Sequence, residues 1–439
     1  MKVKISMKKF YLLTVTLSVF FLSNINAQQL YFPPSGDTWE TIDPSELNWC
    51  QDRIDSLYRM LDEKHTKAFV VLKNGKIVLE KYFDSFTKDS VWYWASAGKS
   101  LSAFLVGLAQ EDGSLDIQDP VSDYLGNGWT SCTPEQEENI KIWHQLTMTT
   151  GLDERGVDPD CLDPNCLKYR TDPGTRWYYH NAPYRLVQDV VANATGMSFQ
   201  QFKNQKLLRS TGISGLWFNY VYFSDIRSMA RFGLLMLAGG DWDGSEIMKD
   251  KDFFTDMITT SQSHNKAYGY LWWLNGKEDY QLPGLPITLN GKIIESAPDD
   301  MYAALGKNDQ KIYVVPSQGL VIVRMGNKAG DIPIYSVSSF DDILWKYINE
   351  LECQPTSTVL QARQTIKVFP TITTGSVYIK GAPENSEWQL ISMYGDLISS
   401  GSVSSGQVEL GADIPGIYFL RVMNDRHRMI SQKKIVVSF

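Results

Sequence analysis

The residues of this chain with the clearest chemical potential are Ser96 and Lys99, three positions apart in Ser96-Ala97-Gly98-Lys99. On a helix, residues i and i+3 share a face, so the amine can lie beside the hydroxyl. A serine hydroxyl is a weak nucleophile at neutral pH and needs a base within hydrogen-bond reach. A lysine at its ordinary pKa of about 10.4 is protonated, so only burial or a nearby cation would make it that base. The pair predicts a serine nucleophile with a lysine base.

The surroundings of Ser96 distinguish it from other serines that have a lysine three residues later. The same spacing occurs at four other places, where a solvated surface is the simpler interpretation: Ser6/Lys9, Ser85/Lys88, Ser263/Lys266 and Ser431/Lys434. Ser96 follows the aromatic run Trp92 to Trp94 and precedes the apolar run Leu101 to Leu108. We therefore expect Ser96 and Lys99 to lie on a buried helix.

A second cluster of polar side chains follows the turn signal Pro173-Gly174. Tyr179 supplies a phenol and Asn181 an amide two residues later, with His180 between them. Tyr178 is an alternative phenol, but only Tyr179 has the two-residue offset to an asparagine. His180 either tunes the site or faces away from it, and facing away is the simpler interpretation.

These motifs resemble the serine β-lactamase-related family, which includes class C β-lactamases, D-alanyl-D-alanine carboxypeptidases, esterases and 6-aminohexanoate-dimer hydrolases. The resemblance runs from about Ala68 to about Ile348. Three further segments carry it in the expected order: Leu146 to Leu152, Met229 to Gly233 and Tyr268 to Trp273.

The resemblance assigns roles to the residues of both clusters. Ser96 would be acylated, Lys99 would take its proton, and Tyr179 would relay protons to the leaving group or from the hydrolytic water. Asn181 would hydrogen-bond the substrate or the lysine. Three tryptophans are candidates to line an apolar substrate pocket, although each is more simply read as core: Trp177, Trp272 and Trp273.

The third element of the family departs from its pattern. The equivalent of the Lys-Thr-Gly of β-lactamases is Ala304-Leu305-Gly306, followed by Lys307. The cation at the first position, which helps to hold a substrate carboxylate, is missing, so a penicillin-like substrate is disfavoured. Gly306 would still allow close approach of the backbone, and the N–H groups of Lys307 and Ser96 would form an oxyanion hole.

Composition limits the classes of partner. The chain has 439 residues, 43% of them hydrophobic, and a formal net charge of -8, so it can bury a large core and has no basic stripe for nucleic acid. The five histidines and five cysteines show no metal-ligand spacing, so we expect no metal and no cofactor. The expected partner is a small-molecule or peptide-like ester or amide.

The N-terminus has the pattern of a signal peptide. Four lysines precede an apolar run from Phe10 to Leu22, and small residues around Ala27 offer a cleavage site. We expect residues 1–27 to be removed and the protein to be secreted or displayed at the cell surface, where disulfides form. Cys161 and Cys166 flank a turn-rich loop that a short bridge could close. Cys50 and Cys353 lie at probable first and last helices, and the resemblance implies that these helices pack together, which predicts a Cys50–Cys353 bridge.

A short polar stretch, residues 353–365, follows the catalytic-type domain and reads as a linker. From residue 366 to 439 the pattern changes to short alternating strands, typical of a small β-sandwich. This tail resembles the C-terminal sorting domain of proteins exported by the type IX secretion system. The residues that carry this resemblance are Gly395, the segment Pro415 to Val422 and the closing segment Lys433 to Val437. Its partner would be the secretion machinery. A carbohydrate-binding or spacer sandwich is the alternative.

The order of elements in residues 28–352 agrees with the same fold. Predicted strands at 68–72 and 77–82 form a hairpin around Asn74-Gly75, and a second pair, 311–315 and 320–325, precedes a final helix. Helical material lies between the pairs. We expect an α/β (α+β) domain of the β-lactamase/transpeptidase type, an antiparallel sheet flanked by helices with a helical region inserted. The predicted activity is a secreted serine hydrolase of the esterase or amidase type. A peptidoglycan D,D-carboxypeptidase or β-lactamase, and a catalytically silent surface binding protein, are the alternatives.

Overall fold

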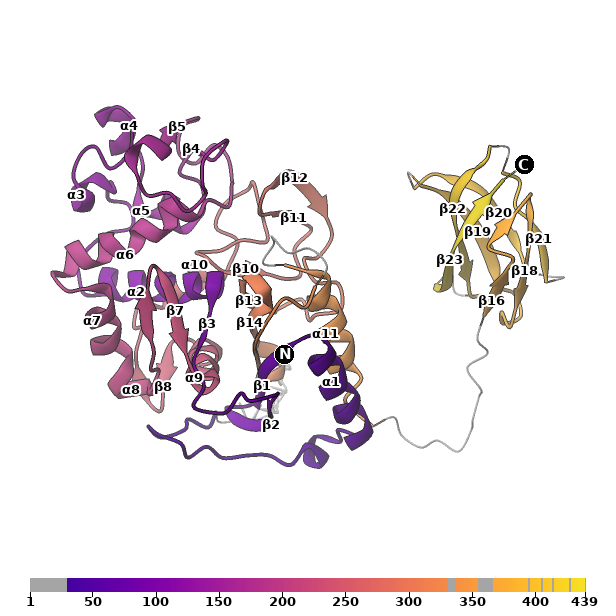
Figure 1. The fold of residues 1–439 in the computed structure, drawn as a ribbon, viewed down its shortest axis with the longest axis horizontal. Helices are drawn as coiled ribbons and strands as arrows, with labels where there is room; N and C mark the ends of the chain where they lie inside the picture. The colour runs from indigo at the N-terminus through magenta and orange to yellow at the C-terminus, as the bar shows by residue number, and fades with distance from the viewer. Residues whose placement is uncertain are drawn as a thin grey trace, which may run out of the picture. The chain divides into compact units, whose positions relative to one another are not determined.

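The computed structural model describes residues 30–330, 337–353, 366–393, 395–403, 406–412, 414–425 and 428–438. The predicted signal peptide and nearly all of the predicted linker lie outside the described residues. The chain divides into two compact units, Met1–Cys353 and Gln354–Phe439 (Figure 1). Among the described residues, no helix is long and apolar enough to cross a membrane.

The first unit is built on a six-stranded antiparallel sheet with the strand order β10-β13-β14-β15-β1-β2. Its strands are β1 (Thr66–Lys73), β2 (Lys76–Tyr82), β10 (Trp273–Leu274), β13 (Tyr302–Gly306), β14 (Gln310–Val315) and β15 (Leu320–Gly326). The β1–β2 hairpin turns at Asn74 and Gly75, both with positive φ, as the Asn-Gly pair predicts. Every residue of β13, β14 and β15 is buried, because helices cover both faces of the sheet.

Helices cover the sheet from two sides (Figure 1). On one side, α1 (Gln51–Glu63) packs against α11 (Ser339–Asn349). On the other, α9 (Ile226–Leu237) lies on β1, β14 and β15. A Cβ on Gly233 of α9 would lie 2.5 Å from Val321 Cγ1, so the glycine permits this close contact.

A helical region is inserted between β2 and β10. Its α-helices are α2 (Gly98–Glu111), α3 (Ser122–Leu125), α4 (Pro134–Glu138), α5 (Ile142–Leu146), α6 (Asn181–Thr195), α7 (Phe199–Lys203), α8 (Arg209–Thr211) and α10 (Lys251–Met257). A π-helical turn, η4 (Asn204–Leu208), joins α7 to α8. Short 3-10 turns of the unit are η1 (Pro44–Leu47), η2 (Ala95–Ala97), η3 (Pro164–Cys166), η5 (Lys307–Asp309) and η6 (Pro316–Gln318). All residues from Gly98 to Ala109 of α2 are buried, as predicted for the helix after Ser96.

Short strand pairs complete the first unit. They are β3 (Trp92–Tyr93), β7 (Val221–Ser224) and β6 (Leu216–Phe218) in one sheet, and the pairs β4 (Leu152–Asp153) with β5 (Lys168–Tyr169), β8 (Asp241–Trp242) with β9 (Ser245–Glu246), and β11 (Asp279–Leu282) with β12 (Leu285–Asn290). Two disulfides are present, Cys50–Cys353 and Cys161–Cys166, which confirms both predicted pairings. Cys132 is a free cysteine.

The second unit consists of two small sheets around a core of its own. Strands β16 (Lys367–Phe369), β18 (Ser376–Lys380) and β21 (Gln407–Glu409) form one sheet. The other sheet has β17 (Ile372–Thr373), β19 (Glu387–Ser392), β20 (Leu397–Ser402), β22 (Gly416–Met423) and β23 (Met429–Val437). Trp388, Leu390 and Leu420 are among the residues that fill the core. The predicted fold class is thus confirmed for both parts.

Candidate active site

Ser96 lies in the middle of η2, the 3-10 turn that leads from β3 into α2, rather than on α2 itself. Ala95, just before it, has a left-handed backbone with φ 48°, a conformation that is rare outside glycine and tends to occur at functional sites. Buried Trp94 anchors the turn, since its indole N–H donates to Ser224 Oγ at 2.8 Å and its backbone N–H donates to Tyr222 O at 2.8 Å. The sharp turn therefore sets Ser96 at the N-terminal end of a rigid helix.

Lys99 lies beside the serine in the first turn of α2. Its Nζ is 2.8 Å from Ser96 Oγ, within hydrogen-bond distance, and the residue is only 3% exposed. Burial lowers the pKa of Lys99 well below its usual value, and the positive charge of Arg185 lowers that pKa further, whereas Asp160 acts in the opposite direction. A neutral amine at this position can accept the proton of the serine hydroxyl.

Tyr179, rather than Tyr178, is the phenol beside Lys99. Lys99 Nζ lies 4.9 Å from the centre of the Tyr179 ring, which is stacked on Trp273 with 5.9 Å between ring centres. Tyr178 instead has its ring 5.0 Å from the guanidinium of Arg176. A second phenol is also close, because Lys99 Nζ lies 3.9 Å from the ring of buried Tyr184 on α6.

Asn181 is the first residue of α6, and its side chain is fixed at one end. Its Nδ2 donates a 2.8 Å hydrogen bond to Asp160 Oδ1, while its Oδ1 is buried and has no hydrogen-bond partner among the described residues. His180, the N-cap of α6, is 4% exposed, and neither of its ring nitrogens has such a partner there. Burial lowers the pKa of His180 to about 4, so the ring is neutral at physiological pH.

Gly306 ends β13 directly against the turn that carries Ser96. A Cβ on Gly306 would lie 2.4 Å from Trp94 O and 3.0 Å from Ala97 N, so a larger residue cannot fit without movement. Lys307 follows in η5, with its side chain exposed. The backbone of residues 306 and 307 therefore passes close beside η2, where the predicted oxyanion hole requires it.

Two buried polar side chains, those of Gln310 and Arg324, hold the turn after Gly306 in place. Gln310 Nε2 donates to Asn308 O at 3.0 Å and to Gly326 O at 2.6 Å. Arg324, which is fully buried, donates from Nη1 to Asp309 O at 2.8 Å. Asn308 also donates from Nδ2 to the Tyr93 hydroxyl at 2.7 Å, which ties the turn to β3. These contacts limit the positions that the backbone of Lys307 can take.

The three tryptophans named as candidate pocket lining are all buried, which agrees with the simpler interpretation of them as core. Trp272 is fully buried between Phe232 and Tyr302, at ring distances of 5.9 and 5.2 Å, and belongs to the core. Trp273 and Trp177 are also buried but contact the Tyr179 ring. Trp177 and Trp273 therefore support the phenol, whereas the segment turns Trp272 inward into the core.

Four residues near Lys99 were missed from the sequence. Tyr184 and Arg185 lie three and four positions after Asn181, a helical spacing that would have indicated them. Tyr268 packs edge-on against Tyr179 and lies in a segment recognised only as a motif. Asp160 carried no signal, because it comes from an irregular loop whose contact with Asn181 depends on the tertiary fold.

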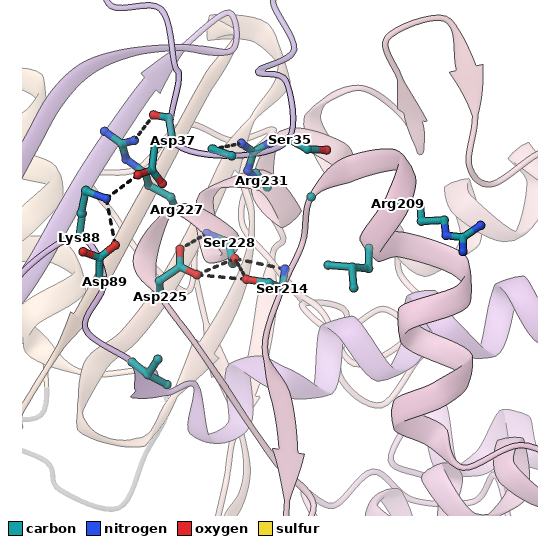
Figure 2. Close-up of a pocket in the computed structure, with 14 residues that line it drawn as sticks. Ser35, Asp37, Lys88, Asp89, Arg209, Ser214, Asp225, Arg227, Ser228 and Arg231 are labelled. Carbon is teal, nitrogen blue, oxygen red and sulfur yellow. Dashed lines mark hydrogen bonds and ion pairs between the residues drawn. The ribbon is translucent and has the colours of Figure 1, made fainter.

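A cavity of about 600 Å³ lies outside this cluster, and Figure 2 shows its lining. Most of its charged side chains pair with another charged side chain, a serine hydroxyl or the backbone. Lys88 pairs with Asp37 at 2.6 Å, and Asp225 accepts from Ser228 Oγ at 2.8 Å. Arg231 donates to Pro34 O at 2.8 Å and to Gly36 O at 3.1 Å. These bonds hold the segment before β1 onto α9, and neither Ser96 nor Lys99 lines this cavity.

Comparison with known proteins shows the family and the fold. The sequence matches the Beta-lactamase family over residues 55–336. It is 24% identical over 285 residues to a 6-aminohexanoate-dimer hydrolase of Paenarthrobacter ureafaciens, covering 54% of this chain and 71% of the relative.

Two solved structures share the fold. A putative beta-lactamase from Bacteroides dorei has a TM-score of 0.55 at 17% identity, covering 70% of this chain and 100% of the other. A putative 6-aminohexanoate-dimer hydrolase from Bacillus anthracis has a TM-score of 0.54 at 18% identity, covering 73% and 87%. The family match spans more than half of the residues, and the chain therefore belongs to the beta-lactamase family of serine hydrolases.

Proposed function

We propose that this protein hydrolyses an ester or amide through an acyl-enzyme on Ser96. The observation that supports this most directly is the buried Lys99 amine, 2.8 Å from Ser96 Oγ and with a pKa lowered by burial. Lys99 takes the hydroxyl proton as Oγ attacks the carbonyl carbon. The tetrahedral oxyanion accepts hydrogen bonds from the backbone N–H groups of Ser96 and Lys307.

Collapse of this intermediate breaks the bond to the leaving group, which receives a proton. Tyr179 lies beside Lys99 and is our candidate to relay that proton. Water then attacks the acyl-enzyme, passes a proton back through the same groups, and releases the acid while Ser96 regains its hydrogen. Asn181 contacts the substrate during these steps.

The substrate class that we propose is a small ester or amide that lacks a carboxylate where a β-lactam carries one. Ala304, where β-lactamases have a cation, is fully buried in β13. A carboxylate would have no cation there, which disfavours the peptidoglycan carboxypeptidase and β-lactamase alternatives. The 6-aminohexanoate-dimer hydrolases among the relatives are consistent with an ester or amide.

We also propose that the protein is exported. The predicted signal peptide, residues 1–27, and the two disulfides support an oxidising compartment. The C-terminal unit would then serve as the address for the type IX secretion machinery, and a binding or spacer role for this sandwich is the alternative.

Intact mass spectrometry of the mature protein after treatment with a fluorophosphonate tests the proposed chemistry. We expect one adduct on the wild type and none on Ser96→Ala, because only an activated serine reacts. Parallel treatment with a penicillin separates the substrate classes, and we expect no adduct. An unlabelled, folded wild type would contradict the proposal and favour a silent binding protein.

A further inference from the structure

The amide of Asn181 is held in one orientation by Asp160. Asn181 Nδ2 donates to Asp160 Oδ1 at 2.8 Å. A carboxylate only accepts hydrogen bonds, so it must take the N–H end of the amide. The carbonyl end, Oδ1, then points away from Asp160. That oxygen is buried and has no hydrogen-bond partner among the described residues.

Asn181 lies on the face of α6 that turns toward the reactive residues. Tyr184 lies one turn after Asn181 on α6, and its ring is 3.9 Å from Lys99 Nζ. Residues three apart share a helix face, so Asn181 lies on the Lys99 side of α6. A buried acceptor without a partner is destabilising, and a bound group that donates a hydrogen bond would satisfy it.

Asp160 and its two neighbours in the chain are held by further contacts. Its carboxylate pairs with Arg185 Nη2 at 3.1 Å. Its neighbour on one side, Pro159, accepts from Ala182 N at 2.9 Å, at the start of α6. Its neighbour on the other side, Cys161, is bonded to Cys166. The loop therefore presents Asp160 to Asn181 in a defined position.

We propose that Asp160 is a positioning residue that makes Asn181 present an acceptor to the substrate, so that the site selects acyl groups with a hydrogen-bond donor near the scissile carbonyl. This inference rests on the proposed function. A hydroxyl or amine on the acyl chain would donate to Asn181 Oδ1. A methyl at the same place would leave the oxygen unpaired, and a carbonyl there would face another acceptor.

Matched esters test the inference. We would measure kcat/KM for the p-nitrophenyl esters of lactate and isobutyrate, and of 3-hydroxybutyrate and 3-methylbutyrate. The two esters of each pair differ only in a hydroxyl in place of a methyl. Each kcat/KM is divided by the rate constant for alkaline hydrolysis of the same ester, which corrects for the intrinsic reactivity of the ester. We expect the wild type to prefer the hydroxyl member of one pair by about tenfold or more.

The variant Asp160→Asn should abolish this preference, because an amide can accept or donate and no longer fixes Asn181. The control Asp163→Asn, an exposed acid in the same disulfide loop, should keep it. If Asp160→Asn does not fold, Asn181→Leu is expected to lose the same preference.

Fluorophosphonate labelling of Ser96 separates the two proposals. A wild type that is not labelled would refute the proposed function. A labelled wild type with no preference in either pair would overturn the inference alone. A preference that survives in folded Asp160→Asn would also overturn it, as would an equal loss of activity on both members of a pair.

Discussion

Opposing influences set the pKa of Lys99, and with it the fraction of the side chain that is the neutral amine. Burial disfavours its ammonium form, Arg185 adds a repulsive positive charge, and Asp160 adds an attractive negative one. Because Arg185 and Asp160 pair with each other at 3.1 Å, a change in one alters the effect of the other. The charge state of the base is therefore set partly by residues that do not touch Ser96 Oγ.

Replacing Arg185 should move the pH dependence of acylation. Arg185→Gln removes a positive charge that lowers the pKa of Lys99, so that pKa should rise. Less neutral amine is then present at a given pH, and the rising limb of the labelling rate should shift to higher pH. Fluorophosphonate labelling of Ser96 across a pH series measures it. Arg209→Gln, at an exposed arginine that lines the other cavity, should leave the limb in place.

Gly306 is the residue whose size matters most beside the nucleophile. In Gly306→Ala the new Cβ would approach Trp94 O at 2.4 Å, so β13 must move away from η2. We expect the labelling rate to fall about 100-fold, the usual effect of losing an oxyanion donor. Gly98→Ala is the matched control, because its Cβ would meet Trp217 at an ordinary 3.4 Å. A Gly306→Ala protein that is labelled as fast as the wild type would contradict an oxyanion role for this backbone.

At the scale of elements, the turn η5 depends on Gln310 as a brace. Gln310→Met keeps the side-chain volume but removes the bonds to Asn308 O and Gly326 O and the bond from Gly326 N to Oε1. Leaving these buried backbone groups unpaired should cost about 1–3 kcal/mol in the free energy of unfolding. Urea denaturation measures this loss, with exposed Gln318→Met as a control that should match the wild type. A slower labelling of Ser96 in the folded variant would show that the brace also serves the site.

Elements with a strong local pattern were predictable from the sequence. The β1–β2 hairpin, β14, β15 and α2 follow from apolar runs and the Asn-Gly turn. No strand was predicted for β20, because Leu397–Ser402 is rich in serine and glycine and pairs with β19 at the edge of its sheet. The two-residue strand β3 was missed for a related reason, since its pairing with β7 joins segments far apart in the chain.

The site was predictable to the extent that its residues lie in short motifs. Ser96 and Lys99 are brought together by one helical turn, so their spacing carried the signal. Tyr179 and Asn181 were predicted from their two-residue offset and from the family resemblance, neither of which gives the orientation of the Asn181 amide. That orientation comes from Asp160, 21 positions earlier, through a loop contact that no local pattern encodes.

At the scale of the whole molecule, the two disulfides stabilise very different lengths of chain. Cys50–Cys353 spans 303 residues and joins the beginning of α1 to the end of the first unit, whereas Cys161–Cys166 spans five. Loop-closure entropy predicts that Cys50→Ser/Cys353→Ser loses about 6 kcal/mol of stability and Cys161→Ser/Cys166→Ser about 2 kcal/mol. Denaturant unfolding of the two double variants compares them directly. Equal losses would show that the closed-loop length does not set the effect.

The Cys50–Cys353 bond also makes residues 50–353 a covalent ring. A protease that cuts this ring once leaves both fragments attached, so the nicked protein keeps its full mass plus one water and separates into two pieces only after reduction. The ring can close only after Cys353 has been synthesised and has left the ribosome. Nearly the whole first unit is therefore made before its two ends are joined. In the finished protein, the fragments of residues 50–353 stay covalently joined after a single proteolytic cut.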